Sequence, residues 1–352
     1  MQDDTSTKPI DEPWPVEGLQ SVPDCPVCGS SQRTLLHDRL KDRVFFCAPG
    51  TWSLYECGDC GCAYLDPRPS PDTIYLAYRE YYTHASPKND GSDAMRFSQW
   101  LKRSMANGYR NWKYGTNLKP ANPLGIPLAL AFPAARQMLD QSFRNLHRPG
   151  PGERLLDVGF GSGEFLEYAK TAGWEVAGVD PDPVSVESAV QRGLNVRHGG
   201  VEAYADMAES FDVITMSHVI EHVHDPHETL KTIYRLLKPG GFLWLSTPNI
   251  QSLGHKYYGR NWRGLEPPRH LILFNWNALI EQIQKVGFNS VQKNETNPNF
   301  ADLAAKSEAI ARGIDPYSSS KRFRHSLKGA LANFRTRFHP YQTEFITLKA
   351  YK

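Results

Sequence analysis

The 352-residue sequence predicts an α/β fold: a doubly wound, mostly parallel seven-stranded sheet with a small N-terminal zinc-knuckle module and a helical lid. Three observations support this prediction. From about residue 150, short apolar runs alternate with windows of helical periodicity. A glycine-rich turn follows the first of these runs. Near the N-terminus, four of the six cysteines form two Cys-x-x-Cys pairs.

The composition narrows the possible functions. Forty Lys and Arg against 38 Asp and Glu give a net charge of +2, and Asp24, Glu56 and Asp59 beside the cysteine pairs would repel phosphate, so we expect no nucleic-acid partner. The chain contains no run of about 18 apolar residues. Its opening, MQDDTSTKPIDEPWP, is acidic and Pro-rich, unlike a signal peptide, so we expect a cytoplasmic protein.

The first 149 residues divide into three parts. We expect a loose tail over residues 1–22, a zinc-binding module over 23–66 and a helical linker or lid over 67–149. Within the linker we expect helices over residues 73–82 and 96–112. The second has an apolar stripe that we expect to face the core: Phe97, Trp100, Leu101, Met105 and Tyr109. Residues 122–132 are apolar but broken by prolines, which allows a hydrophobic lid or a weak membrane-surface contact.

Residues 150–352 carry the sheet. The expected strands are 154–158, 175–179, 195–198, 211–216, 241–246, 289–295 and 344–350. The expected helices are 164–171, 183–192, 201–207, 227–237 and 276–286, and a helical insert covers about 302–334.

The cysteine pairs predict a structural zinc site. In each pair, Cys25/Cys28 and Cys57/Cys60, a Gly follows the second Cys, which favours a tight turn with two sulfurs on one side. Four thiolates complete a tetrahedral shell and leave no position for water. Cys62 is a rival to Cys60, and redox pairs or ordinary buried thiols are the alternatives.

The glycine-rich turn predicts a cofactor site. It reads Leu155-Leu-Asp157-Val-Gly159-Phe-Gly161-Ser-Gly163-Glu164, and glycines allow close approach of the backbone to a ligand. The dinucleotide fingerprint places a third glycine where this chain has Glu164, whose carboxylate would repel a pyrophosphate. The pattern therefore favours a cofactor without phosphate whose cationic amino-acid end Asp157 receives.

In these features the chain resembles the class I S-adenosylmethionine-dependent methyltransferases over roughly residues 150–300. Asp180 closes the second strand, where this family binds both ribose hydroxyls, and residues 200–202 follow the third, where it contacts adenine. Residues 211–226 and 236–243 match the fourth strand and the turn into the fifth. The resemblance implies a Rossmann-like fold, S-adenosylmethionine as cofactor, and cofactor contacts from Asp157, Gly159, Phe160, Gly161, Gly163, Asp180, Pro181, Gly200, Val201, Glu202, Ser217 and His218.

The cysteine pairs and residues 246–249 and 262–274 resemble a bacterial branch of the family that acts on sugars of polysaccharides. The leading hypothesis is therefore methyl transfer to a hydroxyl of a nucleotide-linked or glycan sugar. The segment Glu221-His-Val-His-Asp-Pro226 is also typical of ubiquinone-type O-methyltransferases, so a quinone precursor, lipid or other metabolite is the alternative acceptor. An RNA-binding zinc ribbon and a degenerate scaffold are further alternatives.

Transfer to oxygen requires a base for the acceptor's proton. We predict His222 as first choice and His270 as second, although histidines here could also cap helices or pack against adenine. No cluster of Asp and Asn indicates a magnesium site, so we expect metal-independent transfer. Tyr78, Tyr81, Tyr82 and His84 could line the substrate pocket or pack in the core. The sequence indicates no oligomeric state.

Overall fold

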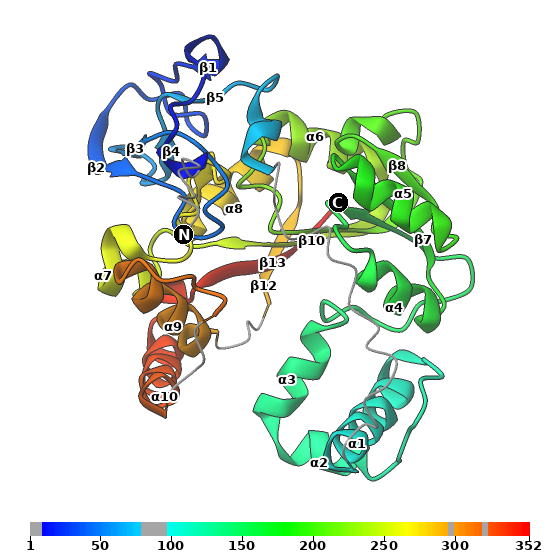
Figure 1. The fold of residues 1–352 in the computed structure, drawn as a ribbon. Coiled ribbons are helices and arrows are strands. Elements are labelled where there is room, and N and C mark those ends of the chain that lie inside the picture. The colour runs from blue at the N-terminus through cyan, green and yellow to red at the C-terminus, as the bar shows by residue number, and fades with distance from the viewer. Residues whose placement is uncertain (1–8, 79–96, 295–298, 319–322) are drawn as a thin grey trace, which may run out of the picture.

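The fold is described by a computed structural model that covers residues 9–78, 97–294, 299–318 and 323–352 (Figure 1). Its centre is a seven-stranded sheet in the order β12-β13-β10-β9-β6-β7-β8. Only β13 runs antiparallel to its neighbours β10 and β12. The strands are β6 (Arg154–Val158), β7 (Glu175–Asp180), β8 (Val196–His198), β9 (Phe211–Ser217), β10 (Leu237–Pro248), β12 (Ser290–Lys293) and β13 (Phe345–Tyr351).

Helices cover both faces of this sheet because its strands are apolar on both faces. Leu155 packs with residues of α4 (Glu164–Ala172) and α5 (Pro183–Gln191). Its neighbour Leu156 points the other way and packs with α6 (Pro226–Leu236) and α8 (Trp276–Val286). The order of strands reverses between β6 and β9, which confirms the predicted doubly wound fold.

The N-terminal part forms a second, four-stranded sheet in the order β11-β4-β3-β2. Its strands are β2 (Arg33–Leu40), β3 (Trp52–Cys57), β4 (Ala63–Leu65) and β11 (Ile272–Leu273). Strand β11 comes from the C-terminal half of the chain, and Tyr64 and Cys57 share one core with Ile272 and Trp276. The two sheets are therefore joined through a common core.

Our expectation of a loose tail is wrong for residues 9–22. They form the 3-10 helices η1 (Pro9–Asp11) and η2 (Val16–Gly18) and the strand β1 (Leu19–Gln20), which pairs with β5 (Arg68–Pro69). Trp14 is buried against Trp52, with ring centroids 5.2 Å apart, and its Nε1 donates to Gly18 O. Burial of the large Trp14 side chain holds this segment in place, although its polar, Pro-rich composition predicts no fixed structure.

The linker contains η3 (Ile74–Tyr78), α1 (Phe97–Tyr114), α2 (Gly125–Ala131) and α3 (Pro133–Gln141). The expected core-facing stripe of α1 is wrong in its first turns, because Phe97 and Trp100 are exposed and Gly108 is buried instead. A Cβ on Gly108 would lie 1.9 Å from Asn122 O, so close approach of the next segment selects the small residues of α1. Of the proposed pocket tyrosines, Tyr78 is described, and Tyr81, Tyr82 and His84 lie outside the described residues.

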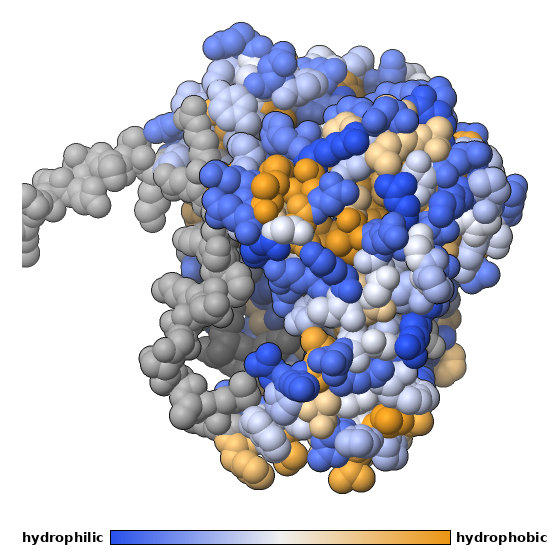
Figure 2. All heavy atoms as spheres, turned by 90° about the vertical axis from the view of Figure 1, so that its right-hand side faces the viewer, coloured by the Kyte–Doolittle hydropathy of each residue, from blue (hydrophilic) through white to orange (hydrophobic). Residues whose placement is uncertain are grey.

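Several apolar side chains of α1 to α3 are exposed, among them Phe97, Leu124, Leu128 and Phe132. Figure 2 shows apolar side chains at the lower edge of one face of the molecule, at the height of α1 to α3 in Figure 1. A lid or a membrane-surface contact for residues 122–132 stays a prediction. Among the helices within the described ranges, none combines the length and apolarity needed to cross a bilayer.

The insertion between β12 and β13 holds α9 (Phe300–Ala311), α10 (Phe323–Phe338) and η7 (Pro340–Gln342). The connections at the carboxyl edge of the large sheet include η5 (Val201–Tyr204), α7 (Leu253–Tyr258) and η6 (Gly259–Asn261).

Candidate active site and cysteine cluster

The glycine-rich turn joins β6 to α4 in the conformation that its glycines allow. Gly159, Gly161 and Gly163 have φ angles of +70°, +54° and +74°. A Cβ on Gly159 would lie 2.4 Å from Val219 Cγ2, whereas one on Gly161 would meet nothing within 4 Å. Gly161 therefore borders open space beside the end of β6.

Asp180 holds this turn from the neighbouring strand. Its carboxylate accepts hydrogen bonds from Gly161 N at 2.7 Å and Asp182 N at 2.9 Å. Burial raises the pKa of Asp180, and the two backbone N–H groups partly offset that rise. The structure thus brings together the turn and the acid that the sequence paired.

Asp157 differs from our expectation. Its side chain is fully buried, pairs with the Arg144 guanidinium and accepts from Thr215 Oγ1 at 2.9 Å. It does not face open space, because Asp157 shares the sheet face of Leu155, beneath the segment that carries Arg144.

The remaining predicted cofactor residues lie at the ends of β6 to β9. Phe160 and Val201 are buried, and Glu202 folds back to accept from Gly200 N at 2.9 Å. Pro181 follows β7, and Ser217 ends β9. His218 has φ +57° and packs edge-on against Phe345 at 4.8 Å between ring centroids.

The predicted bases His222 and His270 meet around Glu221. The two imidazole centroids are 4.8 Å apart. His222 Nδ1 lies 2.9 Å from Arg269 O and 3.1 Å from Tyr78 Oη, and His270 Nδ1 lies 2.8 Å from Gly264 O. Donation from Nδ1 to these carbonyls leaves each Nε2 with a lone pair.

The electrostatics favour an anionic Glu221 and a neutral His270. Burial raises the pKa of Glu221, but the neighbouring His218, His222 and His270 outweigh it and bring the pKa to about 2. Burial lowers the pKa of His270 to about 4, although nearby Glu266 and Glu221 oppose that shift. His222 is half-buried and His270 is buried, so His222 is the more accessible of the two.

The same three residues could also hold a metal ion. Glu221, His222 and His270 each offer one donor atom, and these atoms lie within 4.8 Å of one another. Our search of the sequence for Asp and Asn overlooked this set, because its members come from the loop after β9 and from a distant loop.

Two buried side chains that the sequence did not reveal hold this cluster in place. Arg269 contacts Asp42 at 2.5 Å, Glu266 at 3.0 Å and Ala77 O at 2.8 Å, while its own carbonyl oxygen accepts from His222. Asp42 also accepts hydrogen bonds from four backbone N–H groups of residues 44–48. Arg269 lies in the segment 262–274 that carries the resemblance to a bacterial branch of the family, but that resemblance gives the residue no role, and no motif surrounds Asp42.

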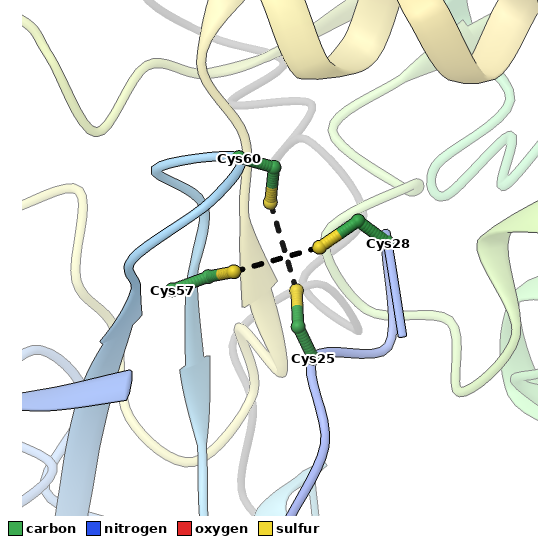
Figure 3. Close-up of side chains that lie close together, drawn as sticks. All are labelled: Cys25, Cys28, Cys57 and Cys60. Atoms are coloured by element: carbon green, nitrogen blue, oxygen red, sulfur yellow. Dashed lines mark hydrogen bonds between the residues drawn. The ribbon is translucent and has the colours of Figure 1, made fainter. Parts of the chain in front are cut away.

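The four cysteines of the two pairs come together at one point (Figure 3). Cys25 Sγ lies 3.7 Å from Cys60 Sγ, and Cys28 Sγ lies 3.5 Å from Cys57 Sγ. These separations match the edge of about 3.8 Å of a tetrahedron with zinc–sulfur bonds of about 2.3 Å. Burial raises the pKa of Cys57, but the N–H groups of Cys60 and Asp59 outweigh it and bring the pKa to about 7.

Comparison with known proteins identifies the family. A family model described as a methyltransferase domain matches residues 133–293. A ubiquinone biosynthesis O-methyltransferase of Cereibacter sphaeroides is 32% identical over 200 residues, which cover 52% of this chain and 78% of that protein. The chain belongs to the class I S-adenosylmethionine-dependent methyltransferases.

Other similarities cover less of the relatives or lie lower in identity. A ubiquinone biosynthesis O-methyltransferase of Ruegeria pomeroyi is 39% identical over 146 residues, and this methyltransferase spans 58% of its length. A solved methyltransferase of Thermotoga maritima, described as a possible histamine N-methyltransferase, is 22% identical, with a TM-score of 0.41 over 64% of this chain and 91% of that one. The solved structure of phosphoethanolamine N-methyltransferase 2 of Haemonchus contortus is 19% identical. Its TM-score is 0.45, and the match covers 82% of this chain and 62% of that one.

Proposed function

We propose that this methyltransferase transfers a methyl group to a hydroxyl of a small-molecule acceptor, with His222 as the base. The observation that carries the proposal is the hydrogen bond from His222 Nδ1 to Arg269 O, at 2.9 Å, because it leaves Nε2 free to take a proton. S-adenosylmethionine, when bound, supplies a methyl group on a sulfonium that an oxygen lone pair can attack in line.

The chain's own residues bind and align the reactants. We propose that the glycine-rich turn and Asp180 bind the cofactor, with Asp180 accepting hydrogen bonds from the ribose hydroxyls. Arg269 and Tyr78 fix the ring of His222 from one side. Glu221, buried and anionic beside that ring, stabilises the imidazolium that forms when His222 takes the acceptor's proton.

We further propose that Cys25, Cys28, Cys57 and Cys60 bind a structural zinc ion. The clustering of the four sulfurs and their separations support this assignment. Four protein ligands leave no position for a substrate, so the ion would hold the module together and take no part in transfer.

For the acceptor, the names of the relatives favour a quinone precursor with a phenolic hydroxyl. The sugar acceptor that we expected from the sequence has no support from these relatives.

Substitution His222→Gln tests the base. Without a group that accepts a proton, kcat should fall by roughly 100- to 10,000-fold. Affinity for S-adenosylhomocysteine, measured by calorimetry, should stay unchanged. His224→Gln is a matched control, since His224 bonds to Pro69 O away from the cluster. An unaltered kcat in His222→Gln would exclude His222 as the base.

A further inference from the structure

Helix α10 presents a row of large apolar side chains to solvent. They recur at steps of three and four residues along the whole helix: Phe323, Leu327, Leu331, Phe334 and Phe338. Because successive residues of a helix are about 100° apart, these five span only about 80° of its circumference and form one face. Each of them is more than half exposed. We call this set the α10 stripe.

The packing of α10 explains why the stripe faces outward. The opposite side of the helix carries Gly329 and Ala332, both buried. A Cβ on Gly329 would lie 2.9 Å from the Cβ of Ala301 in α9, and Ala332 packs with Phe300 and Ala304 of the same helix. The small residues of α10 thus hold it to the fold. Single exposed apolar residues are common on protein surfaces, whereas a contiguous row of them marks an interaction surface.

The charges beside the stripe favour an anionic partner. The helix contains no Asp or Glu, and its cations are Arg324, Lys328, Arg335 and Arg337. Arg324 Nη2 and Lys328 Nζ donate to Glu308 of α9, at 2.5 and 3.1 Å, so one acid offsets part of this charge and the excess stays positive. Long cationic side chains that flank an apolar stripe are typical of helices that lie in a membrane interface.

A second apolar surface lies at the same end of the molecule. Helices α1 to α3 lie below the large sheet in Figure 1, as α10 does, and residues of α3 and α10 line one cavity of about 660 Å³. Leu124, Leu128, Phe132 and Met138 are all exposed on these helices or beside them. The three helices contain five Lys and Arg, and their one acid, Asp140, is buried. Both surfaces therefore combine exposed apolar side chains with positive charge.

We propose that the α10 stripe docks on an anionic lipid bilayer. A bilayer is broad enough to contact both apolar surfaces at once, and anionic lipids complement the excess of cations on both. A second copy of the chain fits less well, because a symmetric contact would place the cations of α10 against those of its partner. Docking on a bilayer does not depend on the proposed reaction.

Sedimentation of the full chain with lipid vesicles tests the contact. The chain should sediment with phosphatidylcholine vesicles that contain about 30% phosphatidylglycerol, and pure phosphatidylcholine should bind it at least about tenfold more weakly. The double variant Leu331→Ser/Phe334→Ser should bind the anionic vesicles at least about tenfold more weakly, because two large apolar side chains are lost from the interface. Val184→Ser/Val190→Ser is the matched control, since both valines are exposed on α5, away from the lower end of the molecule in Figure 1.

Each outcome decides the proposal. It is overturned if the wild-type chain stays in the supernatant, if Leu331→Ser/Phe334→Ser binds as tightly as wild type, or if neutral vesicles bind as tightly as anionic ones. A wild-type dimer that the double variant converts to a monomer would assign the stripe to a second copy, and would also overturn it. An unchanged Tm shows that weaker binding does not come from loss of the fold. Leu327→Ser, a single change of an exposed side chain, carries the test if the double variant fails to fold.

Discussion

Glu344 is a buried carboxyl whose environment disfavours its charged form. Burial raises its pKa to about 7, although hydrogen bonds from Gly254 N and Trp262 Nε1 favour the anion. Between pH 4.5 and 7 the folded chain therefore binds more protons at this site than the unfolded chain, and stability falls as the pH rises through that window.

Glu344→Gln should remove this pH dependence, because an amide does not titrate. Relative to wild type, the free energy of unfolding of the variant should improve by about 3 kcal/mol on going from pH 4.5 to pH 8. Urea unfolding at the two pH values measures the change. The shifted pKa of His270 affects both proteins alike and cancels in the comparison. If the difference in free energy of unfolding between Glu344→Gln and wild type is the same at both pH values, the raised pKa of Glu344 is contradicted.

Single residues also explain what the sequence concealed at the active site. Arg269 and Asp42 lie 227 positions apart and form a fully buried ion pair. Removing one partner of such a pair leaves a buried charge, which typically costs 3–5 kcal/mol. Because the pair exists only through tertiary contact, the sequence pattern around Arg269 does not point to Asp42, whereas His222 stands out within its histidine-rich segment.

At the scale of elements, the glycines of the turn between β6 and α4 serve two different purposes: one lets the chain pack closely, and another leaves space for a ligand. All three of its glycines have positive φ, and Gly159 additionally lacks room for a side chain beside Val219. Gly161 has room in the fold and borders the space proposed for the cofactor.

Gly159→Ala and Gly161→Ala form a matched pair that tests this difference. Both carry the strain of positive φ, about 1–2 kcal/mol. Gly159→Ala adds the contact with Val219 and should lower Tm more. Gly161→Ala should have a higher Tm than Gly159→Ala. Its affinity for S-adenosylhomocysteine should nevertheless fall by at least as much as that of Gly159→Ala. Thermal unfolding and calorimetry give both quantities, and the opposite order of Tm would contradict the account.

The helices of the linker show how packing overrides periodicity. The apolar spacing in α1 is regular, yet Phe97 and Trp100 are exposed and the neighbouring segment packs on Gly108. The sequence predicted a helix here correctly and placed Tyr109 correctly in the core, but it was wrong about the first turns, because the identity of the packing partner is not encoded in the spacing.

At the scale of the whole molecule, the cysteine module and the large sheet form one core. Strand β11 completes the small sheet, Asn275 Nδ2 donates to Cys60 O at 2.7 Å, and Gln282 Nε2 donates to Val27 O at 2.5 Å. Loss of the proposed zinc ion should therefore weaken the entire chain.

Cys57→Ser should abolish zinc binding and lower the stability of the cofactor-binding part as well. Native mass spectrometry should show loss of one zinc ion per chain, and unfolding should remain a single transition at a lower Tm. Cys62→Ser is the matched control, since Cys62 is buried nearby but lies outside the cluster. Zinc retained in Cys57→Ser would overturn the ligand assignment. A second unfolding transition at the wild-type Tm would show that the cofactor-binding part unfolds independently, and would contradict the inference that the two sheets share one core.

The sequence by itself determined the alternation of strands and helices from residue 154 onward, the glycine turn with Asp180, and the two cysteine pairs. Each of these is encoded locally, in the period of apolar residues or in a fixed short spacing. Only the tertiary structure decided that Asp157 is paired with Arg144, that Trp14 packs against Trp52, and that strand β11 ties the small sheet to the large one. These features depend on contacts between distant segments, and such contacts follow from complementary shape and charge, which no short stretch of sequence contains.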